Sequence, residues 1–263
     1  MDHSRALAVL PWLAIFTAQG PLERLGESPR HHEWVEIERG GGRSLHAFVA
    51  YPEAKAKAGA VLVIHENKGL TDWVRAVADR LAEAGLIAIA PDLLSGAGPD
   101  GGRTDSFASS DAATKGLYAL DAGQVSADLD AAAEWALGLP ACDGKLSVVG
   151  FCWGGSRAFE LATNRRGLKA AFVFYGSAPT GEAALARIEC PVYGFYGESD
   201  ARINATLPAT LEAMGKLGKT FEPRTYPGAG HGFLRAGESA GASEANKQAM
   251  QDAWARLRKL LES

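Results

Sequence analysis

The stretch LSVVGFCWGGSRAF, residues 146–159, decides the fold. Its first part is a short run rich in valine, which predicts a strand at 146–149, and its second part has helical spacing over 154–164. Cys152 stands between them, with Gly150 and Gly154 two residues to either side. A nucleophile on a sharp strand-to-helix turn needs such glycines, because side chains there would collide with the other arm of the turn. The alternative is a small core residue, since free cysteine behaves as a small hydrophobe.

Strands and helices alternate along the chain on either side of this turn. The runs AVLVIH, LIAIAP and AAFVFYG are continuously apolar, as expected of strands that are buried on both faces of a parallel sheet. The predicted strands are 32–38, 45–51, 60–65, 87–90, 146–149, 170–175, 192–196 and 221–226, and the predicted helices are 72–84, 125–137, 154–164, 207–217 and 244–261. The pattern predicts an α/β protein with a mostly parallel eight-stranded sheet flanked by helices. The long irregular segment 93–111 is expected to overhang the carboxyl edge of that sheet.

Two further residues follow predicted strands in positions that suit Cys152. A thiol needs a base to become a thiolate and an acid to fix that base. Asp200 in GFYGESDARI and His231 in YPGAGHGF each come just after a predicted strand. The order Cys152, Asp200, His231 is nucleophile, acid and base, which is the order of α/β-hydrolases. Taken singly, Asp200 also suits a helix N-cap and His231 a solvated turn, but the agreement of three strand-end loops favours a catalytic triad.

Composition and charge narrow the class of protein. A chain of 263 residues without a repeat or a long linker predicts one large domain, residues 31–263. The net charge of −4 and the mixed signs give no basic stripe, so we expect no nucleic-acid partner. Cys142, Cys152 and Cys190 are an odd number without CxxC spacing or a nearby histidine cluster, which predicts neither a disulfide framework nor a zinc site. No metal and no cofactor is implied.

The first 30 residues raise a separate question. One arginine precedes an apolar run from Ala6 to Ala18, which resembles a weak signal peptide, but Phe16 and Pro21 fit the cleavage positions poorly. The run is too short to span a bilayer, so no membrane association is predicted. We expect a helix packed on the domain and a cytoplasmic protein. Export to the periplasm is the alternative if the segment acts as a signal.

Five motifs together resemble the dienelactone hydrolase family, α/β-hydrolases that carry cysteine in place of serine. The motifs are HENKGL, APDLLSG, GFCWGG, GESDARI and GAGHGFLR, in the family's order and spacing between about Val61 and Leu261. Cysteine at the elbow together with Glu66 after an early strand separates this family from most serine esterases. The resemblance implies an α/β-hydrolase fold and a carboxymethylenebutenolidase-like activity on a small lactone.

The resemblance also implies a role for each matching residue. By it, Cys152 is the nucleophile, His231 is the base and Asp200 orients the base. Glu66 matches the glutamate that takes the thiol proton when substrate arrives. Arg235, four residues after His231, matches an arginine that binds the carboxylate of the substrate.

Elementary chemistry supports the role of Glu66 and adds an oxyanion hole. A carboxylate at Glu66 beside the thiol disfavours a second negative charge, so the resting thiol would stay neutral. The alternative for Glu66 is a surface acid paired with Lys68 or Arg75. An oxyanion formed on attack needs backbone donors, and the α/β-hydrolase arrangement supplies the amides of Trp153 and Asn67.

The chain departs from the family pattern at one position. Gly96 stands where the family has a second carboxylate-binding arginine, and glycine does not replace a bidentate contact. Arg103 lies seven residues later and is a candidate to swing in, or the role is absent. The alternative for Arg235 is a surface ion pair with Glu238.

These observations lead to one expected activity and two rivals. We expect a monomer or small homo-oligomer that hydrolyses an ester or lactone bond, most of all a carboxylate-bearing enol-lactone, through an acyl-cysteine. A general carboxylesterase or thioesterase is the rival among enzymes. A hydrolase fold kept as an inactive binding module is the rival from another class.

Overall fold

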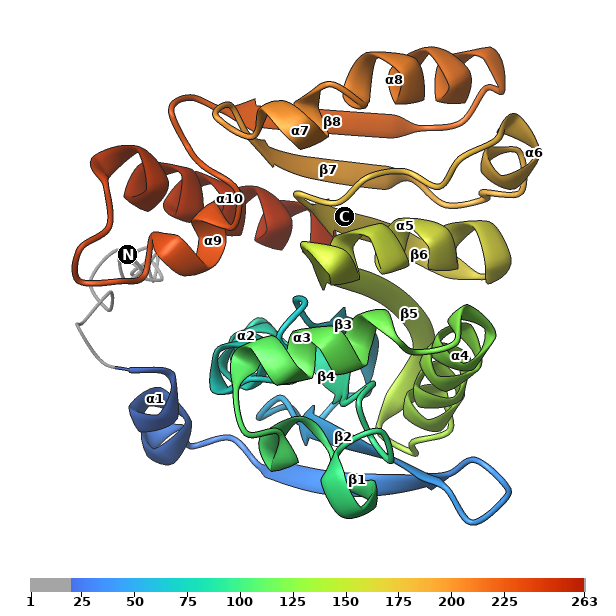
Figure 1. Cartoon of the computed structure of the whole chain (residues 1–263), viewed down its shortest axis with the longest axis vertical. Helices are drawn as coiled ribbons and strands as arrows, with labels where there is room; N and C mark the ends of the chain where they lie inside the picture. The colour runs from blue at the N-terminus through green and yellow to red at the C-terminus, as the bar shows by residue number, and fades with distance from the viewer. Residues whose placement is uncertain (1–19, 263) are drawn as a thin grey trace, which may run out of the picture.

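The computed structural model describes residues 20–262, and one eight-stranded sheet runs through it (Figure 1). The spatial order is β1-β2-β4-β3-β5-β6-β7-β8; the β1–β2 and β2–β4 pairs are antiparallel and the other pairs are parallel. The mostly parallel sheet predicted from the sequence is confirmed. The strands are β1 (His32–Glu38), β2 (Ser44–Ala50), β3 (Ala58–Ile64), β4 (Ile87–Pro91), β5 (Cys142–Phe151), β6 (Leu168–Phe174), β7 (Val192–Gly197) and β8 (Phe221–Tyr226).

Helices cover both faces of the sheet (Figure 1). They are α1 (Pro21–Glu27), α2 (Asp72–Glu83), α3 (Ser110–Tyr118), α4 (Ala122–Leu137), α5 (Trp153–Asn164), α6 (Glu182–Leu185), α7 (Ala201–Asn204), α8 (Leu207–Lys216), α9 (Phe233–Ala236) and α10 (Glu244–Glu262). One apolar core lies between the sheet and α3, α4, α5 and α8, and a second lies between the sheet and α2, α9 and α10. In β3, Leu62 faces the first core and Val63 the second, which is why that run is continuously apolar.

The segment 93–111 is less irregular than its composition predicts. Two short 3-10 turns, Pro99–Gly101 and Thr104–Ser106, lie within it, and α3 begins at Ser110. Ser109 caps α3 by accepting a hydrogen bond from the Ala112 amide at 3.1 Å. The sequence pattern did not predict α3, because the helix buries only Ala113 and Leu117 and so has a narrow apolar stripe.

The part of residues 1–30 that the structure describes packs on the domain. The apolar run 6–18 lies outside the described residues, so the expectations for it stay predictions. Helix α1 packs against α2, and Arg24 of α1 donates to Glu238 at 2.8 Å. Arg30 then forms a bidentate ion pair with Asp79 of α2, at 2.7 Å for each contact. Within residues 20–262, no helix combines the length and the apolar content needed to cross a bilayer.

Candidate active site

The glycine-rich turn that follows β5 is a strained elbow. Cys152 has φ 55° and ψ −115°, between the end of β5 and the first residue of α5. A Cβ at Gly150 would lie 2.0 Å from the Gly154 carbonyl oxygen, and one at Gly154 would lie 2.3 Å from the His65 carbonyl oxygen. The turn can therefore close only with glycine at both positions, as the sequence predicts.

Cys152, His231 and Asp200 form one hydrogen-bonded chain. His231 Nε2 lies 3.1 Å from Cys152 Sγ, and His231 Nδ1 lies 2.5 Å from Asp200 Oδ2. Asp200 is buried at 7% exposure just after β7, and it also caps α7 by accepting from the Ile203 amide at 3.4 Å. Asp200 is thus both a member of this chain and a helix N-cap, the two roles that the sequence suggested for it. The carboxylate fixes the imidazole with Nδ1 protonated and Nε2 toward the sulfur.

The surroundings of His231 favour its protonated form. They raise its pKa to about 9, chiefly through the hydrogen bond with Cys152, with burial opposing and Asp200 adding to the rise. The rise belongs to the state in which the sulfur is a thiolate, because only a negative charge facing Nε2 stabilises the imidazolium.

The loop after β3 is held against the elbow. The ring of His65 stacks on that of Trp153 at 5.8 Å, and the Leu93 amide donates to His65 Nε2 at 3.3 Å. The proton is therefore on Nδ1, which donates to the Glu66 carbonyl oxygen at 2.7 Å. Burial lowers the pKa of His65, so the ring stays neutral. The stack holds the start of this loop against the elbow, and the Trp153 amide, as the first amide of α5, has no acceptor within the helix.

Glu66 and Arg235 form an ion pair beside this turn. Arg235 Nε donates to Glu66 Oε2 at 2.8 Å; the Glu66 side chain is 8% exposed and that of Arg235 is 46% exposed. Two of the three alternative partners suggested by the sequence, Arg75 and Glu238, are engaged elsewhere. Arg75 pairs with Asp72. Glu238 accepts from Arg24, Arg80 and Trp73 at 2.8, 2.9 and 3.1 Å.

Comparison with known proteins shows the family of this chain. The family model described as "Dienelactone hydrolase family" matches residues 45–263. The chain belongs to the dienelactone hydrolase family. It is 33% identical over 249 residues to a "Putative carboxymethylenebutenolidase" of Saccharolobus solfataricus, covering 84% of this chain and 94% of that one. A protein of the same name from Salmonella typhimurium is 32% identical over 228 residues, which is 82% of each chain.

A solved structure extends the likeness to three dimensions. A dienelactone hydrolase from Klebsiella pneumoniae, titled "Putative", superposes with a TM-score of 0.77 at 28% identity, covering 89% of this chain and 99% of that one. The α/β-hydrolase fold expected from the motifs is confirmed, and as a member of the family the chain is an ester or lactone hydrolase.

Arg103, the candidate for the arginine missing at Gly96, contacts the edge strand β1 in this structure. Its guanidinium lies 3.8 Å from the ring centroid of Trp34 on the edge strand β1, and it pairs with Asp105 at 3.2 Å. The next residue, Thr104, donates through its hydroxyl to Asp92 at 2.7 Å and through its amide to the same carboxylate at 3.0 Å. These bonds hold the loop with Arg103 turned toward β1. Both alternatives for Arg103, that it swings in beside Arg235 and that the second arginine's role is absent, stay predictions.

Two residues near the site were not predicted from the sequence, because each stands at the end of a predicted apolar strand, where a core residue is expected. His65 closes the strand 60–65, and Tyr175 closes the strand 170–175. The ring centroid of Tyr175 lies 5.1 Å from that of His231. The available signal was position: both follow strands at the carboxyl edge of the sheet, where Cys152 and His231 also lie.

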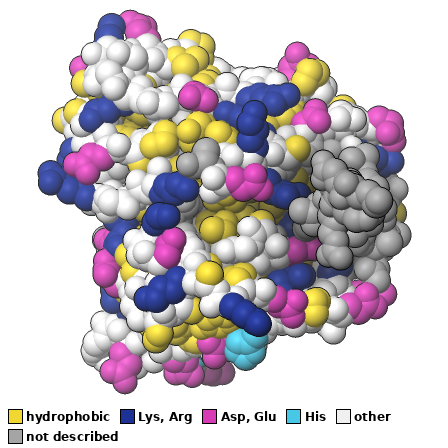
Figure 2. Space-filling view, turned by 180° about the vertical axis from the view of Figure 1, so that it is seen from behind, with side chains coloured by type: hydrophobic (Ala, Val, Ile, Leu, Met, Phe, Trp, Pro, Cys, Tyr) yellow, Lys and Arg dark blue, Asp and Glu magenta, His cyan; other side chains and the backbone are white. Residues whose placement is uncertain are grey.

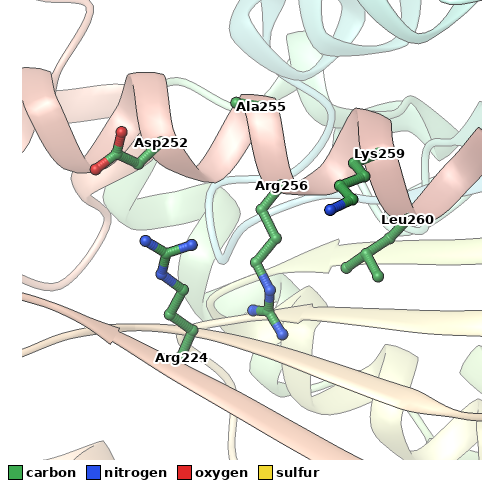
Figure 3. Close-up of a pocket in the computed structure, with 6 residues that line it drawn as sticks. All are labelled: Arg224, Asp252, Ala255, Arg256, Lys259 and Leu260. Carbon is green, nitrogen blue, oxygen red and sulfur yellow. The ribbon is translucent and has the colours of Figure 1, made fainter.

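A hollow of about 420 Å³ lies apart from these residues, between β8 and α10 (Figure 3). Arg256 reaches across it from α10 and donates to the carbonyl oxygens of Gly194 and Glu222 at 2.7 and 2.8 Å, so its charge ties the helix to the sheet. The hollow is lined by Arg224, Asp252, Ala255, Arg256, Lys259 and Leu260.

On the face opposite to that of Figure 1, acidic and basic side chains are interspersed (Figure 2).

Proposed function

We propose that this hydrolase opens a carboxylate-bearing enol-lactone of the dienelactone type through an acyl-cysteine at Cys152. The observation that carries the proposal is the chain Cys152–His231–Asp200 beside the ion pair of Glu66 and Arg235. The name carboxymethylenebutenolidase, given to the relatives, supports a lactone as substrate.

In the resting enzyme the thiol is protected by charge. Arg235 interacts electrostatically with both Glu66 and Cys152, and Glu66 Oε1 borders Gly232, the residue next to His231, whose Nε2 faces the sulfur. A thiolate would then stand beside the carboxylate, which costs free energy because like charges repel. The Glu66 carboxylate therefore disfavours the thiolate before substrate arrives, which makes the sulfur less reactive toward oxidants.

Substrate binding exchanges the partners of Arg235. The substrate carboxylate takes the half-exposed guanidinium, and Glu66, released from it, accepts the proton of the Cys152 thiol. The thiolate attacks the lactone carbonyl, and the amides of Trp153 and Asn67 hold the oxyanion. The C–O bond then breaks, and the enolate leaving group stays attached to the acyl chain because the substrate was a ring.

His231 completes the reaction. Its raised pKa depends chiefly on the contact with Cys152, and acylation of the sulfur removes that cause. The imidazole then becomes a base near neutral pH, and it takes a proton from the water that attacks the thioester. The thiolate then leaves and regains its proton from Glu66, and the His231 imidazolium gives its proton to the enolate. The products are the ring-opened acid and the free thiol.

The carboxylate preference can be tested at Arg235. Arg235→Ala should lower kcat/KM for a carboxylate-bearing enol-lactone by about 10- to 150-fold, because a hydrogen bond to a charged group contributes about 1.5–3 kcal/mol. Hydrolysis of a neutral aryl ester of similar size should change by less than about twofold. Steady-state kinetics with both substrates measure the difference.

Arg103→Ala is the paired test, because Arg103 stacks on Trp34 in this structure. An unchanged ratio of the two substrates would mean that Arg103 takes no part, and a loss on the acidic substrate alone would mean that it swings in. Equal losses on both substrates in Arg235→Ala would contradict the carboxylate-binding role. A wild-type preference for the neutral ester would instead indicate a general carboxylesterase, the rival activity.

A further inference from the structure

Tyr175 adopts a backbone conformation that is unfavourable for its residue type. It follows β6 with φ 42°, in the left-handed region where an L-residue costs about 1 kcal/mol and glycine costs nothing. The chain turns here because Gly176 passes over the start of α5; a Cβ at Gly176 would lie 2.4 Å from the Gly155 carbonyl carbon. Glycine at position 175 would make the same turn without strain. The tyrosine side chain must therefore contribute something that offsets this cost.

The ring of Tyr175 packs on the short turn that the Glu66–Arg235 ion pair also borders. Its centroid is 5.1 Å from that of His231 and 5.6 Å from that of Phe233, the two residues that flank Gly232. A Cβ at Gly232 would lie 3.9 Å from Glu66 Oε1 and 4.0 Å from Arg235 Nη2. The phenol and the ion pair thus border the same short turn after β8.

The hydroxyl of Tyr175 is buried and uncommitted. The residue is 1% exposed, and its Oη has no hydrogen-bond partner among residues 20–262. Burial raises its pKa well above 10, and the charges of Glu66 and Cys152 add to the rise. The group therefore keeps its proton and can act only as a donor toward an anion. A buried hydroxyl without a partner is unfavourable, so a state in which Oη donates is favoured once an acceptor comes within reach.

We propose that Tyr175 is a positioning residue: its hydroxyl donates to the Glu66 carboxylate when a substrate carboxylate takes Arg235, and so holds Glu66 toward the Cys152 thiol. The inference rests on the proposed function. The Glu66 side chain is only 8% exposed, so water cannot readily replace the guanidinium it gives up. A charge-assisted hydrogen bond from the phenol compensates for that loss.

The test measures thiolate formation without turnover. A γ-lactam bearing the substrate carboxylate binds but is not hydrolysed, and the ultraviolet absorbance of the thiolate reports the proton transfer. In wild type the lactam should raise the thiolate signal. In Tyr175→Phe the rise should fall by about tenfold, the effect of one hydrogen bond to a charged group. With the enol-lactone itself, kcat should fall by a similar factor at unchanged KM.

Two further variants make the result specific. Tyr196→Phe is the matched control, because Tyr196 is also 1% exposed with an unpartnered Oη but interacts with Arg256 instead of Glu66; it should behave as wild type. In a Glu66→Gln background, Tyr175→Phe should change kcat by less than about twofold, because the carboxylate it serves is gone. Thermal unfolding of Tyr175→Phe checks that the ring still packs.

The outcomes separate this inference from the proposed function. If the lactam raises the thiolate signal equally in wild type and Tyr175→Phe, the positioning role is wrong and the proposed function stands. If Tyr175→Phe raises KM for acidic substrates in both backgrounds, the phenol binds substrate, and the inference is overturned. If wild type gives no signal with bound lactam, the proton transfer to Glu66 fails, and both fall.

Discussion

Replacing Cys152 with alanine is expected to lower kcat/KM for the enol-lactone by about 10⁴- to 10⁶-fold. Alanine keeps the elbow and the oxyanion amides but removes the atom that forms the acyl-enzyme. The remaining rate should be that of binding and oxyanion stabilisation alone, since such sites retain some catalysis without their nucleophile. Hydrolysis of the lactone and of an aryl ester, followed by absorbance, measures the loss.

The other two cysteines provide the matched control. Cys142 and Cys190 are 5% and 6% exposed and belong to the first core. Burial raises the pKa of the Cys190 thiol to about 11, so it is unreactive near neutral pH. Cys190→Ala should keep nearly full activity at a small cost in stability. Equal rates in wild type and Cys152→Ala would mean that the measured hydrolysis does not use this site and would favour the inactive binding module.

Asp200→Asn should have the second largest effect, a fall in kcat of about 10⁴-fold. Asp200 Oδ2 accepts the proton of His231 Nδ1, and an asparagine amide that donates to Nδ1 would stabilise the wrong tautomer. The fold should survive, because asparagine caps helices as well as aspartate does and the Ile203 amide keeps an acceptor. Steady-state kinetics and circular dichroism together separate lost activity from lost structure.

We expect the effect of Asp200→Asn on the free energy of unfolding to depend on pH. The folded enzyme holds the pKa of His231 at about 9, above 6.5, through Cys152 and, to a smaller degree, Asp200. A raised pKa stabilises the folded state below pH 6.5, and this stabilisation is lost as the pH rises through about 9. The difference in unfolding free energy between wild type and Asp200→Asn should shrink over that range. A difference that grows with pH would contradict this account of the His231–Asp200 pair.

The sheet was predictable because buried parallel strands leave a strong signal. Strands β1 and β8 have the predicted limits, whereas β5 begins at Cys142 instead of Leu146. The additional residues at the start of β5, CDGK, are mostly polar, and the last three of them are exposed. No apolar pattern therefore marks them as part of the strand. Helix α1 buries no residue and is held by the bond from Arg24 to Glu238, 214 positions away, which no local pattern can reveal.

The triad was predictable for a related reason: the carboxyl ends of parallel strands meet at one edge, so Cys152, Asp200 and His231 could be placed together from their order. The choice of ionic partners was not predictable in this way. Glu66 and Arg235 each had a basic or acidic neighbour closer in sequence, and only the packing of the loops decides between them. The positive φ of Tyr175 is likewise invisible in a run that reads as a regular strand.

The central claim, an acyl-enzyme on Cys152, is most directly tested by intact-protein and peptide mass measurements on His231→Asn after mixing with the enol-lactone and quenching with acid. In the proposed mechanism Glu66 takes the thiol proton and His231 serves the later hydrolysis, so this variant should still acylate and should accumulate the intermediate. We expect a mass increase equal to the whole lactone, because the leaving group stays attached, located on the peptide that contains Cys152. An adduct on another residue, or rapid hydrolysis with no adduct at any time, would contradict the account.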